Sequence, residues 1–157
     1  TGVQTCALPI FEALLCFDVI IAERQARFGL PEVLFGLFPG MGAYSILARR
    51  LGHRMAEKMI LEGKVFSAEE MYDMGLVAAL ADTGKGEEVA TQWIADHIDR
   101  HAGHVGVFRA GRRVNPMTLD ELRDIVENWV DTALKLTEKD RKMMRRLAAA
   151  QTRLHRR

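Results

Sequence analysis

The stretch Phe28-Gly-Leu-Pro-Glu-Val-Leu-Phe-Gly-Leu-Phe-Pro-Gly-Met-Gly42 decides how the rest of the sequence is interpreted. Its two prolines and four glycines exclude one continuous helix or strand. Its one charged side chain, Glu32, follows a proline and precedes three apolar residues, so we expect an apolar environment around it. Burial of that kind raises a carboxyl pKa and makes the group a candidate proton carrier. The alternative is an ordinary surface turn that caps a helix.

The second half of this stretch, Phe38–Gly42, has the composition of a tight turn that opens a helix. The unpaired N–H groups of such a helix start could face a substrate. We predict this helix over residues 43–51, with Gly52 beyond its end. A second helix over 54–62 is predicted to stop at Gly63.

Upstream, residues 12–17 favour a short helix, and the β-branched run Val19–Ala22 predicts a strand that is apolar on both faces, as in a covered sheet. A further short strand is predicted to begin at Phe28–Gly29. Residues 1–10 show neither helical nor strand periodicity.

Downstream, two capping-box patterns predict helix starts, Ser67-Ala-Glu-Glu70 and Thr118-Leu-Asp-Glu121. The first helix should end near Gly75, and the second should be long, with an apolar side toward the rest of the chain. Residues 76–80 are predicted to be extended, residues 87–98 helical, and Thr137 is predicted to cap the last helix. The apolar faces of the two last helices indicate either core packing or subunit contacts.

Three histidines, His97, His101 and His104, lie near the end of the helix predicted over 87–98. Their spacing would suit a metal only in a continuous helix, and we expect Gly103 to interrupt it. No carboxylate or cysteine completes the set, so we predict surface histidines and no metal site.

Composition and charge limit the class of protein. The 157 residues are 48% hydrophobic and 27% charged, which is typical of one globular α-rich domain with a few strands. The formal net charge is +1, but residues 138–157 carry +6 and the first 137 residues carry −5. The basic tail is either a solvated helix end or a contact for an acidic partner or phosphate. The overall charge gives no case for nucleic acid.

The cysteines and the hydropathy pattern indicate the cellular compartment in which we expect this protein. Cys6 and Cys16 form no CxxC motif, so we expect free thiols in a reducing, cytoplasmic setting. No apolar run approaches the roughly 20 residues of a membrane span, and no signal peptide is evident.

Several segments together resemble the crotonase (enoyl-CoA hydratase) superfamily. In order, they are Phe11-Glu-Ala-Leu-Leu15, Asp18-Val-Ile-Ile-Ala-Glu23, Phe28-Gly-Leu-Pro-Glu32, Phe38-Pro-Gly-Met-Gly42, Gly63, Ser67–Glu70 and Met74-Gly-Leu-Val77. Three segments are similar to the diffusible signal factor synthase branch in particular: Leu30–Phe35, Leu37–Ser45 and Trp129-Val-Asp-Thr-Ala133. The resemblance covers residues 11–157.

The resemblance implies an α/β fold of the ClpP/crotonase kind, present here as an incomplete C-terminal half. Residues 11–82 would form the C-terminal part of the spiral core, and residues 83–157 a helical region for core packing and oligomerisation. It also implies a homo-oligomer, a trimer or a dimer of trimers, with a sensor protein as a possible partner.

The resemblance also implies a chemistry. Members bind acyl thioesters of coenzyme A or acyl carrier protein without a further cofactor, and Glu12 and Glu32 stand where the two family glutamates stand. Two carboxyl groups in different protonation states can supply the base for the C2 proton and the acid for the C3 hydroxyl of a 3-hydroxyacyl thioester. The sequence leaves open which glutamate is which, and Glu12 could instead cap the first helix. Gly40, Met41 and Trp129 are the implied substrate-binding residues.

One motif departs from the family. Relatives have three glycines just before the Phe-Glu pair, and the N–H group of the middle glycine stabilises the thioester oxyanion. Here Leu8, Pro9 and Ile10 occupy these positions, and proline has no N–H group. We therefore expect the oxyanion donor to be absent at Pro9, residues 1–10 to be foreign to the family, and the 157-residue chain to be inactive alone.

Three functions stay open on these grounds. The first is a dehydratase and thioesterase that makes a cis-2-unsaturated fatty acid signal, used in quorum sensing, from 3-hydroxyacyl carrier protein. The second is an ordinary enoyl-CoA hydratase or acyl-CoA hydrolase. The third is a non-catalytic fragment that binds partner subunits.

Overall fold

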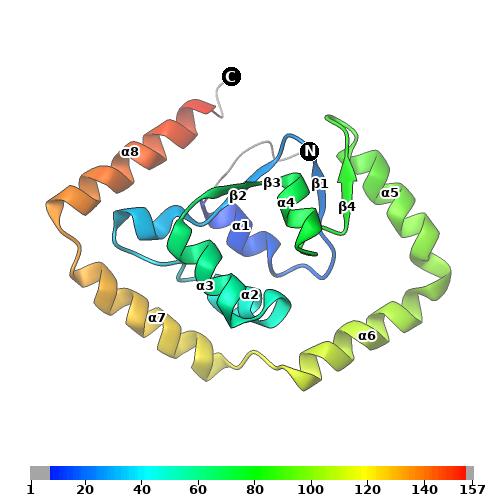
Figure 1. The fold of residues 1–157 in the computed structure, drawn as a ribbon. Coiled ribbons are helices and arrows are strands. Elements are labelled where there is room, and N and C mark those ends of the chain that lie inside the picture. The colour runs from blue at the N-terminus through cyan, green and yellow to red at the C-terminus, as the bar shows by residue number, and fades with distance from the viewer. Residues whose placement is uncertain (1–7, 155–157) are drawn as a thin grey trace.

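Short strands and helices alternate in the first half of the chain, and long helices make up the second (Figure 1). The computed structural model describes the backbone of residues 8–154 and the side chains of residues 11–149. The first half contains α1 (Leu8–Leu14), β1 (Ile21–Glu23), β2 (Arg27–Gly29), η1 (Pro31–Phe35), α2 (Ala43–Leu51), α3 (His53–Glu62), β3 (Val65–Ser67), α4 (Ala68–Asp73) and β4 (Ala79–Ala81). The second half contains α5 (Gly86–His97), η2 (Ile98–Arg100), α6 (His101–Val114), α7 (Leu119–Leu134) and α8 (Glu138–Leu154).

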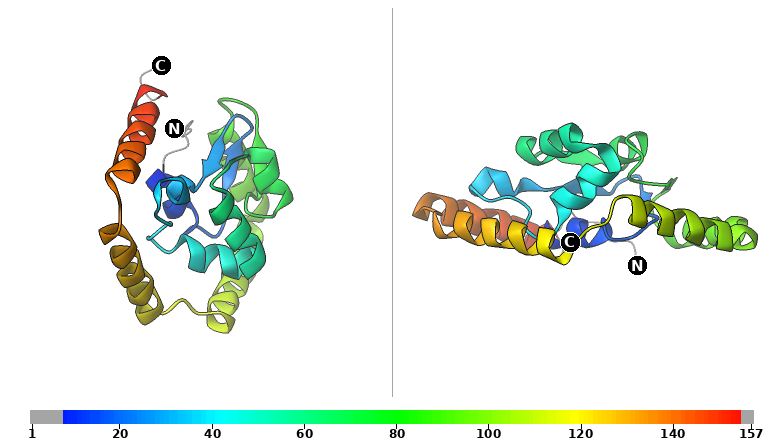
Figure 2. Two further views of the ribbon diagram at one scale, coloured as in Figure 1. Left: turned by 60° about the vertical axis from the view of Figure 1, so that its left-hand side comes forward. Right: turned by 90° about the horizontal axis from the view of Figure 1, so that it is seen from below.

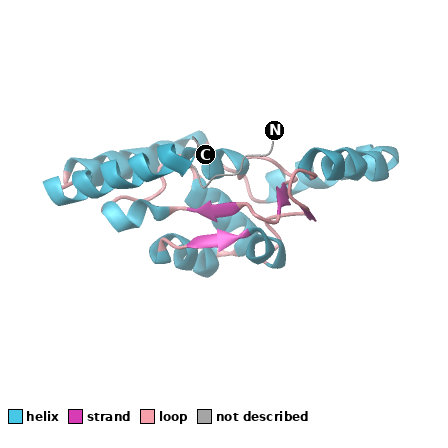
Figure 3. Cartoon of the chain, turned by 90° about the horizontal axis from the view of Figure 1, so that it is seen from above, coloured by secondary structure: helices cyan, strands magenta, loops and turns pink. Residues whose placement is uncertain are grey.

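The strands form two separate pairs. Strands β1 and β4 are parallel, with Ile21 opposite Ala79, and β2 and β3 are antiparallel, with Arg27 opposite Ser67. Figure 3 shows both pairs as short segments among the helices. Within the described residues, the second edge of β1 has no strand beside it. The strand expected over Val19–Ala22 therefore exists, but it begins two residues later and is paired on one edge.

Within the described residues, the core lies in the first half. Among the described residues, the buried apolar side chains fall between Phe11 and Ala81, and Leu15, Leu47 and Met59 are almost completely buried. Helices α2 and α3 pack on one another over this core. Apolar contact of this kind supplies the main stabilising free energy of a small domain.

The helices of the second half curve around the core as an arc (Figure 1). We call residues 86–154 the helical arc. Seen from below, these helices lie in one thin layer (Figure 2, right). Helices α5, α6 and α7 bury no residue completely. In the described part of the chain, no helix combines the length and apolar character that crossing a membrane requires.

Most predicted helix boundaries are confirmed. The α2 and α3 helices end at Gly52 and Gly63 as expected, and Ser67 and Glu70 form the complete capping box. At α7 only half of the predicted box forms. The Thr118 hydroxyl accepts the Glu121 N–H, but the Glu121 carboxylate pairs with Arg49, because a charged partner outcompetes a backbone amide.

Two expectations were wrong. Gly103 does not interrupt a helix, because α6 runs through it and the break falls earlier, at η2. Glycine costs a helix about 1 kcal/mol relative to alanine, which lowers its stability without excluding it. The first helix also begins at Leu8, ahead of the expected position 12, and it accommodates Pro9 because the first turn needs no N–H donor there.

Candidate active site

The Glu12 carboxylate is buried between α1 and the turn that precedes α2. Its side chain is 4% exposed, and its Oε1 atom accepts the Met41 N–H at 3.0 Å. The N–H group expected to face a substrate thus faces a carboxylate instead. Glu12 lies inside α1, so the alternative that it caps this helix is excluded.

Two effects oppose one another on the Glu12 carboxyl. Burial raises its pKa, while the N–H groups of Met41 and Ala43 favour the charged form and lower it. Burial is the larger effect, and the net shift is upward. The N–H groups at the start of α2 nonetheless donate hydrogen bonds to the Glu12 carboxylate and hold it in place.

Glu32 is also buried, at 9% exposure, in the short helix η1. Burial raises its pKa to about 7, and the negative charge of Glu12 adds to the shift. Its Oε2 atom has no hydrogen-bond partner among the described residues. The burial expected for Glu32 and the upward direction of its pKa are therefore confirmed. The structure brings the two glutamates into electrostatic contact, and their catalytic roles stay a prediction.

Two glycines give the turns around these carboxylates their shape. Gly36 ends η1 with φ of 80°, and Gly42 opens α2 with φ of 91°. Both values lie in the left-handed region that glycine adopts without steric cost. These turns return the chain from Glu32 to the Met41 amide that holds Glu12.

Helix α7 covers the Pro39–Gly42 turn. A Cβ atom added to Gly40 would lie 2.6 Å from Trp129 Cδ1, so the indole ring rests directly on this glycine. Met41 points outward and is 60% exposed. The predicted substrate-binding residues Gly40, Met41 and Trp129 therefore come together beside Glu12, and their binding role stays a prediction. Pro9 lies in the first turn of α1, with its side chain outside the described residues.

Arg49 holds α7 in this place, and sequence reasoning missed it. It donates to both Glu121 carboxylate oxygens, at 2.7 and 2.6 Å, and to the carbonyl oxygen of Pro116 at 2.7 Å. The Arg49 side chain is 22% exposed and links α2 to the α6–α7 connection. No local pattern could have revealed the pair, because its members stand 72 positions apart.

A cavity of about 590 Å³ lies between α2, α3 and α7. Apolar side chains such as Phe38 and Ile125 line it together with Tyr44, His53 and Glu57. Neither Glu12 nor Glu32 lines this cavity, so it is separate from the paired carboxyl groups.

The three histidines fall around the α5–α6 junction. The His97 ring stacks on Trp93 with centroids 4.0 Å apart, and the His104 ring meets His97 edge-on at 5.1 Å. Among the described residues, no group of three or more His, Cys, Asp or Glu side chains could hold a metal ion.

The fold and this site define a class of protein. The profile of the enoyl-CoA hydratase/isomerase family matches residues 11–113, and the chain belongs to that family. Its fold is crotonase-like. A carnitinyl-CoA hydratase from Mycobacterium avium superimposes with a TM-score of 0.71 over 90% of this chain and 55% of that structure, at 24% identity, which speaks for the fold alone.

Individual relatives fit this class. The chain is 40% identical over 90 residues to 2,3-dehydroadipyl-CoA hydratase of Escherichia coli, and 37% identical over 101 residues to mevalonyl-coenzyme A hydratase of Beauveria bassiana. These matches cover 57% and 64% of the chain, but only 34% and 36% of the relatives. DspI of Pseudomonas aeruginosa is 36% identical, with a TM-score of 0.51 over 55% of this chain and 33% of that one. The chain thus spans about a third of the length of the curated relatives named here.

Proposed function

We propose that this chain carries the two proton-transferring carboxyl groups of an enzyme that adds water to, or removes it from, an acyl thioester. The observation that carries the proposal is the pair of buried carboxyl groups, Glu12 and Glu32, with different surroundings. Glu12 accepts a backbone N–H, whereas Glu32 has a pKa of about 7 and an oxygen that finds no partner in the described part of the chain. The names of the curated relatives, both hydratases of CoA esters, support the same reaction class.

The surroundings suggest a division of labour. In hydration, the Glu12 carboxylate takes a proton from a water molecule while the oxygen of that water bonds to C3 of the 2-enoyl thioester. Protonated Glu32 gives its proton to C2. Dehydration is the reverse: Glu32 as carboxylate takes the C2 proton, and Glu12 returns a proton to the departing C3 hydroxyl. A pKa of about 7 lets Glu32 serve in either direction near neutral pH.

Both directions place charge on the thioester oxygen, which N–H donors must stabilise. Each such donor is typically worth about 3–4 kcal/mol. Pro9 supplies none at its position, so we still expect the 157-residue chain to be inactive alone.

For the finer identity we propose a synthase that dehydrates 3-hydroxyacyl carrier protein to a cis-2-enoyl chain and releases the fatty acid. The turn Phe38-Pro-Gly-Met-Gly and the segment Trp129–Ala133 support this reading, since Trp129 packs on Gly40 of that turn. The second candidate is an ordinary enoyl-CoA hydratase, favoured by the relatives' names. A non-catalytic fragment is the third.

The test uses the chain joined to an upstream half from the family, with glycine at positions 8–10. We expect Glu12→Gln and Glu32→Gln each to lower thioester dehydration by about 10²–10⁴-fold, because glutamine keeps the size and loses the proton. Glu57→Gln, outside the carboxylate pair, is the matched control and should leave the rate unchanged.

Three outcomes separate the candidates. Near-normal product release by both site variants would sink the two-carboxylate assignment. Equal turnover of carrier-protein and CoA substrates would favour the ordinary hydratase. Activity of the unextended chain comparable to that of the extended one would show that the oxyanion donor is misplaced.

A further inference from the structure

Helix α8 separates its residue types into two faces. At 100° per residue, Arg141, Lys142, Arg145 and Arg146 occupy one continuous side of the helix. Met143, Met144 and Leu147 occupy the remaining side, where Met143 borders Arg146 and Met144 borders Arg141, each about 60° away around the helix. After Asp140 the sequence contains no further acidic residue up to its end, while seven of the remaining residues are Lys or Arg.

The basic face of α8 is exposed and largely unpaired. Arg141 forms an ion pair with Glu138 at 3.1 Å within the first turn of the helix. Across the described side chains, Lys142, Arg145 and Arg146 have no carboxylate within 4.0 Å. Their charges therefore face solvent and attract an acidic surface over roughly a Debye length, about 8–10 Å at physiological salt.

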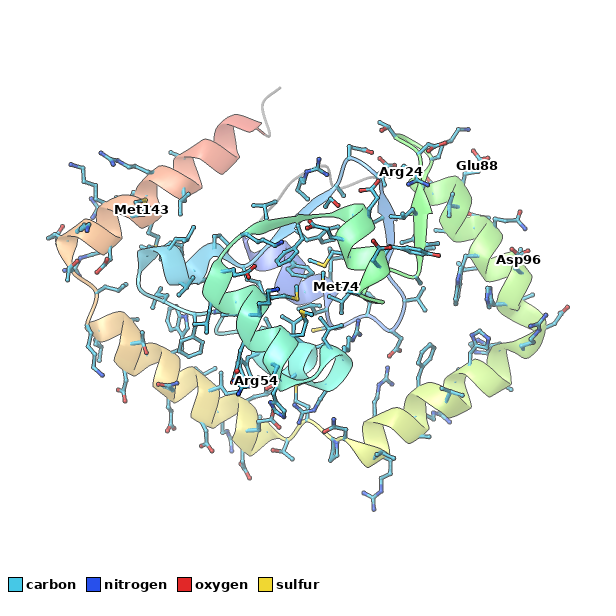
Figure 4. All side chains as sticks on the ribbon, viewed as in Figure 1. Arg24, Arg54, Met74, Glu88, Asp96 and Met143 are labelled. Atoms are coloured by element: carbon cyan, nitrogen blue, oxygen red, sulfur yellow. The ribbon has the colours of Figure 1, made fainter. Side chains whose placement is uncertain are left out.

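The methionine face is also partly open. Met143 is 39% exposed and Met144 is 37% exposed. Figure 4 labels Met143 on α8. Methionine is flexible and polarisable, and exposed methionines are common at surfaces that bind other proteins. Apolar contact beside positive charge suits an acidic protein better than it suits bare phosphate or nucleic acid, which would engage the charges alone.

The position of α8 ties this surface to the carboxylates. Its start packs on η1, the short helix that holds Glu32, and the Asp140 side chain lies against Gly36 at the end of η1. From Asp140 to Arg146 the helix advances about 9 Å. A protein held on α8 would therefore sit beside the segment that carries the buried carboxyl group.

We infer that α8 is the docking surface for an acidic carrier protein that presents its acyl thioester on a flexible arm. The inference rests on the proposed function, which requires a thioester substrate, and adds how that substrate is delivered. The basic face gives attraction and orientation, and the bordering Met143 and Met144 give apolar contact. The contact with η1 places α8 next to the segment that carries Glu32.

The test measures binding of a fluorescently labelled holo acyl carrier protein, without an acyl group, to the 157-residue chain. Lys142→Glu with Arg146→Glu reverses two charges one turn apart on α8. Arg109→Glu with Arg113→Glu makes the same change in charge and spacing on α6, where both side chains are exposed. Circular dichroism checks that each variant folds, and Lys142→Gln with Arg146→Gln provides a milder second variant.

We expect the α8 reversal to weaken carrier binding at least tenfold at low salt, the glutamine pair to weaken it less, and the α6 reversal to change it less than twofold. Binding of the wild-type chain should also fall steeply as salt increases. Carrier protein lacking its phosphopantetheine arm should still bind, because the docking contact is between protein surfaces.

The inference is overturned if the wild-type chain does not bind the carrier, or if both reversals weaken binding equally. It is also overturned if free coenzyme A, anionic phospholipid vesicles or single-stranded RNA binds α8 more tightly than the carrier does. Binding needs no turnover, so the result is independent of the carboxylate chemistry. If the carrier docks on α8 but the chain joined to an upstream half, with glycine at positions 8–10, shows no dehydration that depends on Glu12 and Glu32, only the proposed function is contradicted.

Discussion

The core segment, residues 11–81, and the helical arc, residues 86–154, are built on different principles. The core segment holds the buried apolar side chains of the described chain as well as both buried carboxyl groups. The arc is made of amphipathic helices in which many apolar residues stay exposed, for example Val107 at 70% and Leu134 at 80% exposure. The difference indicates that close packing fixes the two carboxyl groups within the core segment, while the arc contacts that segment at separate points.

Those attachment points are specific. Arg49 fastens the start of α7, Trp129 rests on Gly40, and Leu136 and Asp140 contact Gly36. Between them, Val126, Val130 and Leu134 follow one another at every fourth position of α7 and are 46%, 44% and 80% exposed. Exposed apolar patches usually mark interaction sites. We keep the prediction of a homo-oligomer on this basis.

The largest expected effect comes from a cavity in the core segment. Leu47→Ala removes a side chain with 0% exposure and should lower the free energy of unfolding by about 2–5 kcal/mol. Urea denaturation followed by circular dichroism measures it. A loss below about 1 kcal/mol would mean that the core segment is packed more loosely than its burial indicates.

The next effect depends on pH. Because the pKa of Glu32 is about 7 in the folded chain and 4.5 ordinarily, the folded state binds the proton more tightly, and stability falls as pH rises through this range. Glu32→Gln removes that loss, so it should stabilise the chain by up to about 3 kcal/mol at pH 8 and by almost nothing below pH 4.5. Unfolding curves at pH 4 and pH 8 compare the two, and a pH-independent effect would contradict the buried, proton-binding carboxyl.

A third change breaks an attachment of the arc. Gly40→Ala places a Cβ atom 2.6 Å from the Trp129 ring, so the ring and α7 must shift, with an expected cost of about 1–3 kcal/mol. Trp129 fluorescence in a Trp93→Phe background reports the shift. Gly40→Ala combined with Trp129→Ala should cost much less than the sum of the two single changes. Strict additivity would indicate that the two residues do not touch.

The smallest effect is expected inside the arc. Val107→Ser on α6 replaces a side chain that is 70% exposed and should change the free energy of unfolding by less than about 0.5 kcal/mol. The same urea titration applies. A cost above 1 kcal/mol that grows with protein concentration would place Val107 in a subunit interface.

Local chemistry made much of this structure predictable. Gly52 and Gly63 ended their helices as expected, and Ser67 capped α4, because each signal acts within one turn of backbone. The burial of Glu32 was predictable from its apolar neighbours and the proline before it. Where the local rule was weak, prediction failed: the glycine penalty at Gly103 was too small to end α6.

The pairing of distant groups was beyond the sequence. Arg49 and Glu121 stand 72 positions apart, and Met41 donates to Glu12 across 29 positions. Arg49 and Glu121 could each have paired with many side chains of opposite charge along the sequence. The packing of α7 against α2 brings these two together. The resemblance proposed both glutamates, but not that a backbone amide would hold one and leave an oxygen of the other unpartnered.

The sequence by itself determined most of the helix boundaries, because helix caps, proline and apolar periodicity act over a few residues. The resemblance implied the pair of glutamates, and the apolar neighbours of Glu32 independently indicated its burial. The tertiary structure decided the pKa values of those two carboxyl groups. Burial between α1, η1 and the turn before α2 raises both pKa values. The negative charge of Glu12 raises the pKa of Glu32 further above its ordinary value. Desolvation and charge–charge interaction depend on distance in space, and that distance exists only once the chain has folded.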